Sequence, residues 1–339
     1  MTQTPPDLTP RLRPRPKSFP APEFPPRKPK LFARTPPAVF SSLLGLLGLG
    51  LAARRGLGWL GLETGLAEVA LGAILPVFCF ALVALAVKVA RRPAVVLEDM
   101  RVLPGRAGYA TASMGVMASA AVLAPYAPEL AVGVLGLGLA LHLALAGLWI
   151  KVWLGLPAEG RVVTPAWHLS FVGFIVGAVS AVSMGFEAVA QGILWAVMPV
   201  AAAIWGVSLA QLIARIPPAP LRPLLAIHLA PAALFATVAH GLGQDLLAYS
   251  FASFGAVIFA SLLLCARWLT ASGFSPLWGS FTFPLASYAA ALISLGGPWA
   301  DAGIAVLLLA CAVIPMIGVR VVKMWATGAL AAKTNAAEA

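Results

Sequence analysis

The sequence predicts an all-α polytopic membrane protein with ten transmembrane helices paired as five helical hairpins. Of its 339 residues, 60% are hydrophobic and only 10% are charged, a balance typical of chains that lie in lipid. Apolar runs of about 20 residues, the length that crosses a bilayer, recur along the chain. In addition, Lys and Arg are distributed unevenly between the loops, as the positive-inside rule predicts for a multi-pass protein.

We divide the chain into three parts: a disordered, proline-rich and basic cytoplasmic tail at 1–35, a transmembrane domain at 36–326 and a cytoplasmic tail at 327–339. The first part has too few apolar residues to form a core, and it lacks the apolar centre of a signal peptide. The net charge of +11 does not indicate a nucleic-acid partner, because such a protein carries its charge on a folded polar surface that this chain lacks.

Ten apolar segments account for the transmembrane domain. If the N-terminus is cytoplasmic, ten spans return the C-terminus to the same side and leave only Arg54 and Arg55 on the outer side among all the Lys and Arg residues. This pattern predicts a bacterial inner-membrane protein with both termini in the cytoplasm. The predicted segments are 36–53, 66–90, 107–124, 129–154, 165–184, 188–212, 223–241, 246–269, 277–296 and 301–326.

The odd-numbered segments begin in a similar way and at similar intervals, which suggests repeated hairpins. Thr35-Pro36, Thr164-Pro165 and Ser275-Pro276 place a hydroxyl and then a proline at three of these starts. This chemistry predicts capping of the helix N-terminus by the hydroxyl. Each odd helix would then bring about half a positive charge to the cytoplasmic side.

Odd and even segments also differ in composition. The odd ones carry most of the hydroxyl and proline residues, together with glycines such as Gly115, Gly173 and Gly177, whereas the even ones are plainer runs of Leu, Ala and Val. We therefore expect the odd helices to form an inner pore ring and the even helices to face lipid or neighbouring subunits. The alternative is that glycine and serine only allow close helix packing. The candidate pore-lining residues are Gly115, Gly173, Gly177, Pro231, Thr237, Thr282 and Pro284.

Pro284 interrupts the ninth segment. A proline there removes the hydrogen bond to the carbonyl of Ser280 and crowds the preceding turn, so a kink is expected beside Phe283. Irregular backbone at membrane depth is tolerated where other helices or a water-filled path satisfy the freed carbonyl. This segment is therefore a candidate wall of a conduit, although a proline kink packed between neighbouring helices is the alternative.

No charged residue lies in the middle of an odd segment. Since transporters that couple to protons or sodium usually carry such residues, their absence argues against a proton relay and against a cation pore with acidic rings. Arg101, Arg106, Arg161 and Arg222 would form a basic inner mouth that attracts anions. The alternative for these arginines is that they only set the topology.

No motif indicates an enzyme or a cofactor. The sequence contains no nucleophile elbow, P-loop or HExxH motif, and we expect no catalytic residue, no metal site and no cofactor. Cys79, Cys265 and Cys311 lie in three different segments and are predicted to be buried packing residues. The four histidines lie at scattered depths, which disfavours haem, although His168 and His228 could shape the inner mouth.

Three motifs carry a resemblance to a known family: Arg34-Thr35-Pro36-Pro37-Ala38-Val39-Phe40, Thr164-Pro165-Ala166-Trp167 and Phe281-Thr282-Phe283-Pro284. From about residue 34 to 326 the chain resembles the bacterial tellurite-resistance permease TehA family, which includes plant slow-type anion channels and fungal malate permeases. The resemblance implies five hairpins with quasi-five-fold symmetry, an anion pore formed by the odd helices, a homotrimer and a phenylalanine that plugs the pore. The family's motif places that pore gate at Phe283. Unlike the plant members, this chain lacks long regulatory termini.

These observations lead to the hypothesis of an anion channel or uniporter for small monovalent anions or dicarboxylates, gated by Phe283. Tellurite resistance is implied only by the family. One alternative is a proton-coupled exporter of dicarboxylate or tellurite. Another is a haem-bearing or structural membrane subunit without a transport role. The expected partners are the lipid bilayer, inorganic or organic anions and two further copies of the chain.

Overall fold

The computed structural model describes residues 30–157 and 161–339, and within these residues it is helical and has no strand. Most of the predicted disordered tail therefore lies outside the described residues. The α-helices are α1 (Val39–Trp59), α2 (Gly65–Arg91), α3 (Val95–Arg101), α4 (Leu103–Leu123), α5 (Pro128–Leu154), α6 (Phe174–Ser183), α7 (Glu187–Ala214), α8 (Leu229–Gly241), α9 (Asp245–Leu264), α10 (Ala266–Leu269), α11 (Gly279–Leu295), α12 (Gly297–Ala326) and α13 (Ala329–Lys333). Short π- or 3₁₀-helical segments precede α6, α8 and α11. They are the π-helical η2 (His168–Val172) and the 3₁₀ helices η3 (Ala219–His228) and η4 (Pro276–Trp278).

Helix is present in every predicted segment. By length and composition, six helical stretches of the described chain could cross a membrane: α2, α5, α7, η3 together with α8, α9 and α12. The all-helical membrane class is therefore confirmed, and the count of ten spans stays a prediction. The stretch from η2 to α6 is apolar but shorter.

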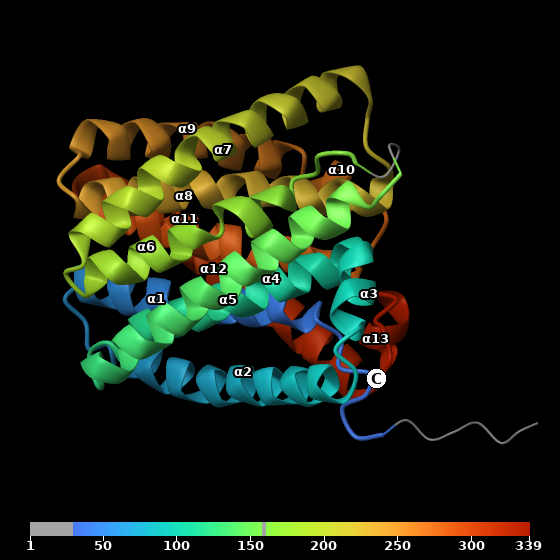
Figure 1. The fold of residues 1–339 in the computed structure, drawn as a ribbon. Coiled ribbons are helices and arrows are strands. Elements are labelled where there is room, and N and C mark those ends of the chain that lie inside the picture. Colours follow the sequence, from blue (N-terminus) through green and yellow to red (C-terminus); the bar gives the residue numbers. More distant parts are fainter. Residues whose placement is uncertain (1–29, 158–160) are drawn as a thin grey trace, which may run out of the picture.

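The helices differ in burial in an alternating way. Every residue is buried from 107 to 120 in α4, from 229 to 236 in α8 and from 282 to 289 in α11, whereas α9 buries only Ala248, Ala252 and Gly255. The more buried helices contact one another in cyclic order, since α1 packs against α4 and α11, α6 against α4 and α8, and α8 against α11. Each is followed by a less buried helix that packs against it (Figure 1).

The predicted capping by hydroxyl side chains is wrong. No N-cap side chain of these helices makes a capping hydrogen bond, and the Thr35 hydroxyl donates to the carbonyl of Phe32 instead. The reason is that short turns precede the α-helices. The amides of Trp167 and Trp278, which the hydroxyls would have capped, donate to the backbone carbonyls of Thr164 and Ser275 at 2.9 and 3.0 Å.

The prediction that the cysteines are buried is also wrong, because Cys79, Cys265 and Cys311 are all exposed. Cys79 and Cys311 lie on α2 and α12, and Cys265 directly follows α9. These helices turn much of their surface away from the rest of the protein, so an apolar residue there is not necessarily a core residue.

A buried ion pair joins several segments at the end of the bundle that carries the C-terminus and residue 30, where the described chain begins. The Lys88 ammonium contacts Asp99 Oδ2 at 2.7 Å, and both side chains have zero exposure. Lys88 also donates to the carbonyl of Thr35 at 3.0 Å, and the Tyr109 hydroxyl donates to Asp99. The amide of Ala337 donates to Asp99 Oδ1 at 2.7 Å. The pair thus connects α2, α3, α4, the segment that precedes α1 and the C-terminal segment.

We predict that Asp99→Asn destabilises the protein by about 3 to 5 kcal/mol, because it leaves the Lys88 charge buried without a counter-ion. Unfolding of the detergent-solubilised protein by heat or denaturant would measure the effect. Glu98→Gln is the matched control, since Glu98 pairs with Arg92 at a site where both side chains are 42% exposed, and it should cost less than about 1 kcal/mol. Equal losses in the two variants would contradict the importance of burial.

Candidate functional site

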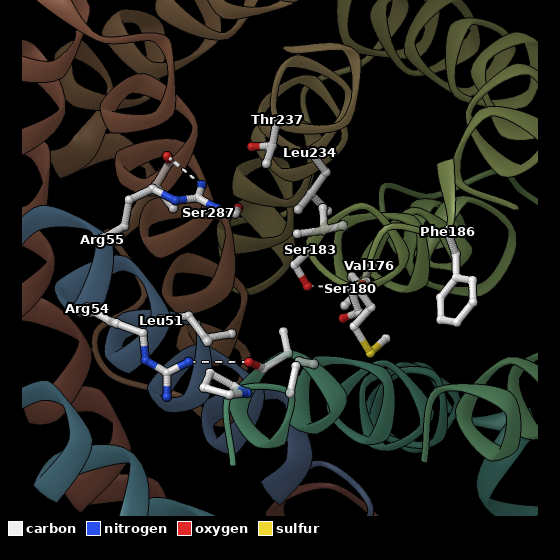
Figure 2. Close-up of a pocket in the computed structure, with 18 of the residues that line it drawn as sticks. Leu51, Arg54, Arg55, Val176, Ser180, Ser183, Phe186, Leu234, Thr237 and Ser287 are labelled. Carbon is white, nitrogen blue, oxygen red and sulfur yellow. Dashed lines mark hydrogen bonds between the residues drawn. The ribbon is translucent and has the colours of Figure 1, made fainter. Parts of the chain in front are cut away.

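A large cavity of about 820 Å³ opens among the buried helices. It lies at their ends remote from the C-terminus, next to the turns that join α1 to α2, α4 to α5 and α6 to α7 (Figure 1). Figure 2 shows Leu51, Ser180, Ser183, Leu234 and Thr237 arranged around its open centre. The side chains come from α1, α6 and α8, so the cavity lies inside the cycle of buried helices.

A small cavity of about 40 Å³ lies toward the other end. It is lined by Ser41 of α1, Thr111 of α4, Leu224 of η3 and Ser280 and Pro284 of α11. Ser280 donates a hydrogen bond to the carbonyl of Pro223 at 2.6 Å, which joins the start of α11 to η3. The small cavity is therefore bounded by the short turns through which the buried helices begin.

Phe283 of α11 lies between the two cavities. Within the described chain it is the only residue that lines both of them, and its side chain is buried with 7% exposure. The ring lies against Gly48 of α1, where a Cβ would come within 3.1 Å of ring atom Cδ2. The absence of a side chain at Gly48 thus leaves the space that the ring occupies.

A second glycine of α1 fixes the position of α11. The hydroxyl of Thr282 donates to the carbonyl of Ser41 at 3.2 Å and to that of Gly279 at 2.7 Å. A Cβ at Gly45 would lie 2.1 Å from the Thr282 hydroxyl and 3.1 Å from the amide nitrogen of Phe283. Only a residue without a side chain allows this approach. The backbone of Phe283 therefore lies at the Gly45 contact, and its ring lies against Gly48, about one turn further along α1.

The predicted pore-lining residues are distributed unevenly. Thr237 lines the large cavity and Pro284 the small one, and Thr282 is buried between α11 and α1. Pro231 is buried in α8 and lines neither cavity.

The three predicted glycines also line neither cavity. A Cβ at Gly115 would meet the ring of Phe78, and one at Gly173 would meet the ring of His142. At Gly177 it would meet the side chains of Leu139 and Met117. These contacts fit the packing alternative, in which small residues let neighbouring helices approach.

The four predicted inner-mouth arginines line neither cavity. The Arg106 guanidinium lies 4.4 Å from the ring centre of Trp149, and that of Arg222 lies 4.4 Å from the ring centre of Trp268. Arg161 donates to two backbone carbonyls, and Arg101 is exposed at the end of α3. Cation–π contacts and hydrogen bonds hold three of the four in place.

Arg54 and Arg55 line the large cavity, and the sequence predicted only that they lie on the outer side of the membrane. Arg54 forms a two-point pair with Glu68 at 2.6 and 2.7 Å. Arg55 donates one hydrogen bond, to the carbonyl of Ala290 at 3.0 Å. Glu68 also accepts from the Tyr126 hydroxyl at 2.7 Å, which raises the pKa of that phenol. Their position as the only two cations on the predicted outer side was the signal for this site.

The histidines lie apart from both cavities. Nε2 of His168 and Nδ1 of His228 are 3.0 Å apart, and His142 Nδ1 lies 2.8 Å from the Ser113 hydroxyl. In the described ranges, no group of three or more His, Cys, Asp or Glu side chains could hold a metal ion. The polar part of the site therefore consists of hydroxyls, two arginines and Glu129, next to the buried aromatic ring of Phe283.

We predict that Gly45→Ala destabilises the protein by about 1 to 3 kcal/mol, because the methyl group pushes α1 away from Thr282 and the α11 backbone. Gly58→Ala is a matched control on the same helix, since a Cβ there meets nothing within 4 Å. It should leave stability unchanged or raise it by up to about 1 kcal/mol through helix propensity. Thermal unfolding of both variants would test this, and equal stabilities would argue against the close contact.

The geometry can be compared with known proteins. A family model described as voltage-dependent anion channel matches residues 34–324, a range that includes every helix around the two cavities. No curated protein matches the chain.

Proposed function

This chain belongs to the voltage-dependent anion channel family, and on that premise we propose that it is an anion channel or uniporter gated by Phe283. It is a multi-pass integral membrane protein. In our proposal it passes small monovalent anions or dicarboxylates along their electrochemical gradient, through the centre of the cycle formed by α1, α4, α6, α8 and α11.

The observation that carries the proposal is the position of Phe283 between two cavities that share no other lining residue in the described chain. An aromatic ring in a narrow neck excludes water, and an ion that must pass without water meets a high barrier. The neck is narrow because α1 and α11 approach closely at Gly45 and Gly48. A small displacement of this ring would join the two cavities.

The proposed architecture extends the six apolar helical stretches to ten spans. The fifth and ninth predicted segments correspond to α6 and α11, which are shorter helices that begin in π or 3₁₀ turns. Length and hydropathy alone therefore identify fewer of the odd-numbered segments as membrane spans. Irregular turns at membrane depth are tolerated where protein surrounds them or where they line a cavity. Their burial and the cyclic contacts of their helices support this arrangement.

The distribution of charge favours an uncoupled route over a proton-coupled exporter. Among the described residues, the buried charged side chains are Lys88 and Asp99, which pair with each other. Neither lines a cavity. A proton relay through the membrane needs ionisable groups along the path, and the lining between the two cavities offers Phe283 instead.

Other parts of the hypothesis rest on the sequence or on the family resemblance alone. The bacterial inner membrane, the cytoplasmic location of both termini and the homotrimer stay predictions. Tellurite as a substrate and the tail at 1–35 also stay predictions. No observation on the described chain favours a haem-bearing or purely structural subunit.

We predict that Phe283→Ala raises anion conductance at least about tenfold, because removing the ring opens the neck to water and ions. Chloride and nitrate currents recorded from purified protein in planar bilayers would measure the effect.

Phe281→Ala is the matched control for that experiment. Phe281 is also on α11, but its ring packs against Trp278, and it borders a different, apolar cavity on the outside of α11. Its removal should leave conductance at the wild-type level. An equally low current in well-incorporated Phe283→Ala protein would contradict the gate, and an increase in both variants would indicate nonspecific loosening of α11.

A second functional prediction concerns coupling. In proteoliposomes, anion flux through Phe283→Ala should follow the anion gradient and the membrane voltage, and a pH gradient imposed at fixed voltage should change it less than about twofold, because the route lacks a proton relay. Flux that requires the pH gradient would favour the proton-coupled exporter.

A further inference from the structure

We infer that Arg55 is an anion-binding residue of the large cavity, at which a small anion docks on the cavity side of Phe283. This inference rests on the proposed function, because it assigns an entry or exit step of the same route. The ligand class is a small monovalent anion such as chloride or nitrate, or one carboxylate group of an organic acid.

The hydrogen bonding of Arg55 leaves most of its guanidinium available. Its only hydrogen bond within the described residues goes from one terminal nitrogen to the carbonyl of Ala290, at 3.0 Å. A guanidinium carries five N–H donors in a planar fork that matches planar oxyanions. Arg55 is exposed and lines the large cavity, and Figure 2 shows its side chain extending toward Ser287.

Neighbouring Arg54 is a contrast within the same cavity. Its guanidinium forms two short bonds with Glu68 and donates to the carbonyls of Ala121 and Val122. Its charge is neutralised, and four of its five N–H donors are occupied. The two arginines are adjacent in sequence. Of the two, Arg54 pairs with Glu68, whereas Arg55 has no carboxylate partner in the described chain.

The remaining polar groups of the cavity do not replace Arg55. The hydroxyls of Ser180, Thr237 and Ser287 donate to the backbone carbonyls of their own or a neighbouring helix, so their hydrogens are already used. Glu129 is the acidic residue in the cavity lining. It lies at the start of α5, which packs on α4 and α6, whereas Arg55 is on α1 and bonded to α11. Arg55 is therefore the residue of the large cavity that can donate hydrogen bonds from an unpaired positive charge to a docked anion.

The position along α11 connects this site to the gate. Ala290, which accepts the Arg55 hydrogen bond, follows Phe283 by seven residues, which is about 10 Å along a helix. This distance is close to the Debye length of about 8 to 10 Å at physiological salt. An anion held at Arg55 is thus next to the neck, and the positive charge raises the local anion concentration there.

The first test uses the conducting Phe283→Ala background. Adding Arg55→Gln should raise the anion concentration for half-maximal current, applied on the large-cavity side, by roughly 2- to 10-fold. Arg55→Lys, which keeps the charge, should shift it less. The difference should disappear near 1 M salt, where the Debye length is about 3 Å. A purely structural role of Arg55 would not show this dependence on charge and salt.

The matched control is the double variant Arg92→Gln/Glu98→Gln, which removes an ion pair whose two side chains are 42% exposed and line neither cavity. Its half-maximal concentration should equal that of the background. A shift as large as that of Arg55→Gln would overturn the assignment, and so would an unchanged value in Arg55→Gln.

A second measurement does not depend on conduction. Crystals of the wild-type chain soaked in bromide should give an anomalous scattering peak beside the Arg55 guanidinium, and Arg55→Gln crystals should lack it. If Phe283→Ala carries no current but bromide binds at Arg55, the channel proposal fails and the site stands. If Phe283→Ala conducts but no bromide is found at Arg55, or the peak persists in Arg55→Gln, the site is overturned and the channel proposal stands.

Discussion

The close approach of α1 to α11 is the contact on which the rest of the structure depends. Gly45 and Gly48 present no side chain, so the backbone of α11 comes near enough for Thr282 to bond to the carbonyl of Ser41. This bond sets the rotation of α11, and the rotation directs the next side chain, Phe283, into the space over Gly48. The ring therefore lies inside the bundle, between the two cavities, because α1 and α11 approach closely at Gly45 and Gly48.

The two ends of the bundle are built on different principles. At the end with the C-terminus, short turns, the buried pair of Lys88 and Asp99 and the C-terminal segment interlock, and the cavity there is only about 40 Å³. A buried pair requires precise partners because either charge alone is costly in a low-dielectric interior. At the other end, single turns join the helices and the cavity is about 820 Å³. One end thus holds the helices in register, and in our proposal the other end admits anions.

The sequence predicted what depends on the local pattern of residues. Runs of about 20 apolar residues gave the helical ranges, and the proline in Phe281-Thr282-Phe283-Pro284 pointed to the residue between the cavities. It did not predict what depends on the neighbour across a helix interface. Gly115 and Gly173 face Phe78 and His142, and Arg106 stacks on Trp149, because packing decides which face each helix turns inward. The sequence also could not predict that the Arg55 guanidinium lacks a carboxylate partner, because this depends on Glu68 pairing with Arg54 and not with Arg55.

The polar groups of the proposed route determine which anions it favours. Serine and threonine hydroxyls along it donate mainly to backbone carbonyls, as Ser287 does to Phe283 and Thr237 to Ala233, so they offer little to an ion that has lost its water. An unsatisfied charge in such surroundings is costly, and the cost grows with the strength of hydration. The neck at Phe283 should therefore favour weakly hydrated anions, whereas Arg55 attracts any small anion by its charge. Our proposal thus assigns attraction to Arg55 of α1 and selection to Phe283 of α11, which lies about 10 Å along α11 from Ala290, the hydrogen-bond acceptor of Arg55. A strongly binding site inside the neck would slow the ion's exit, and this separation avoids one.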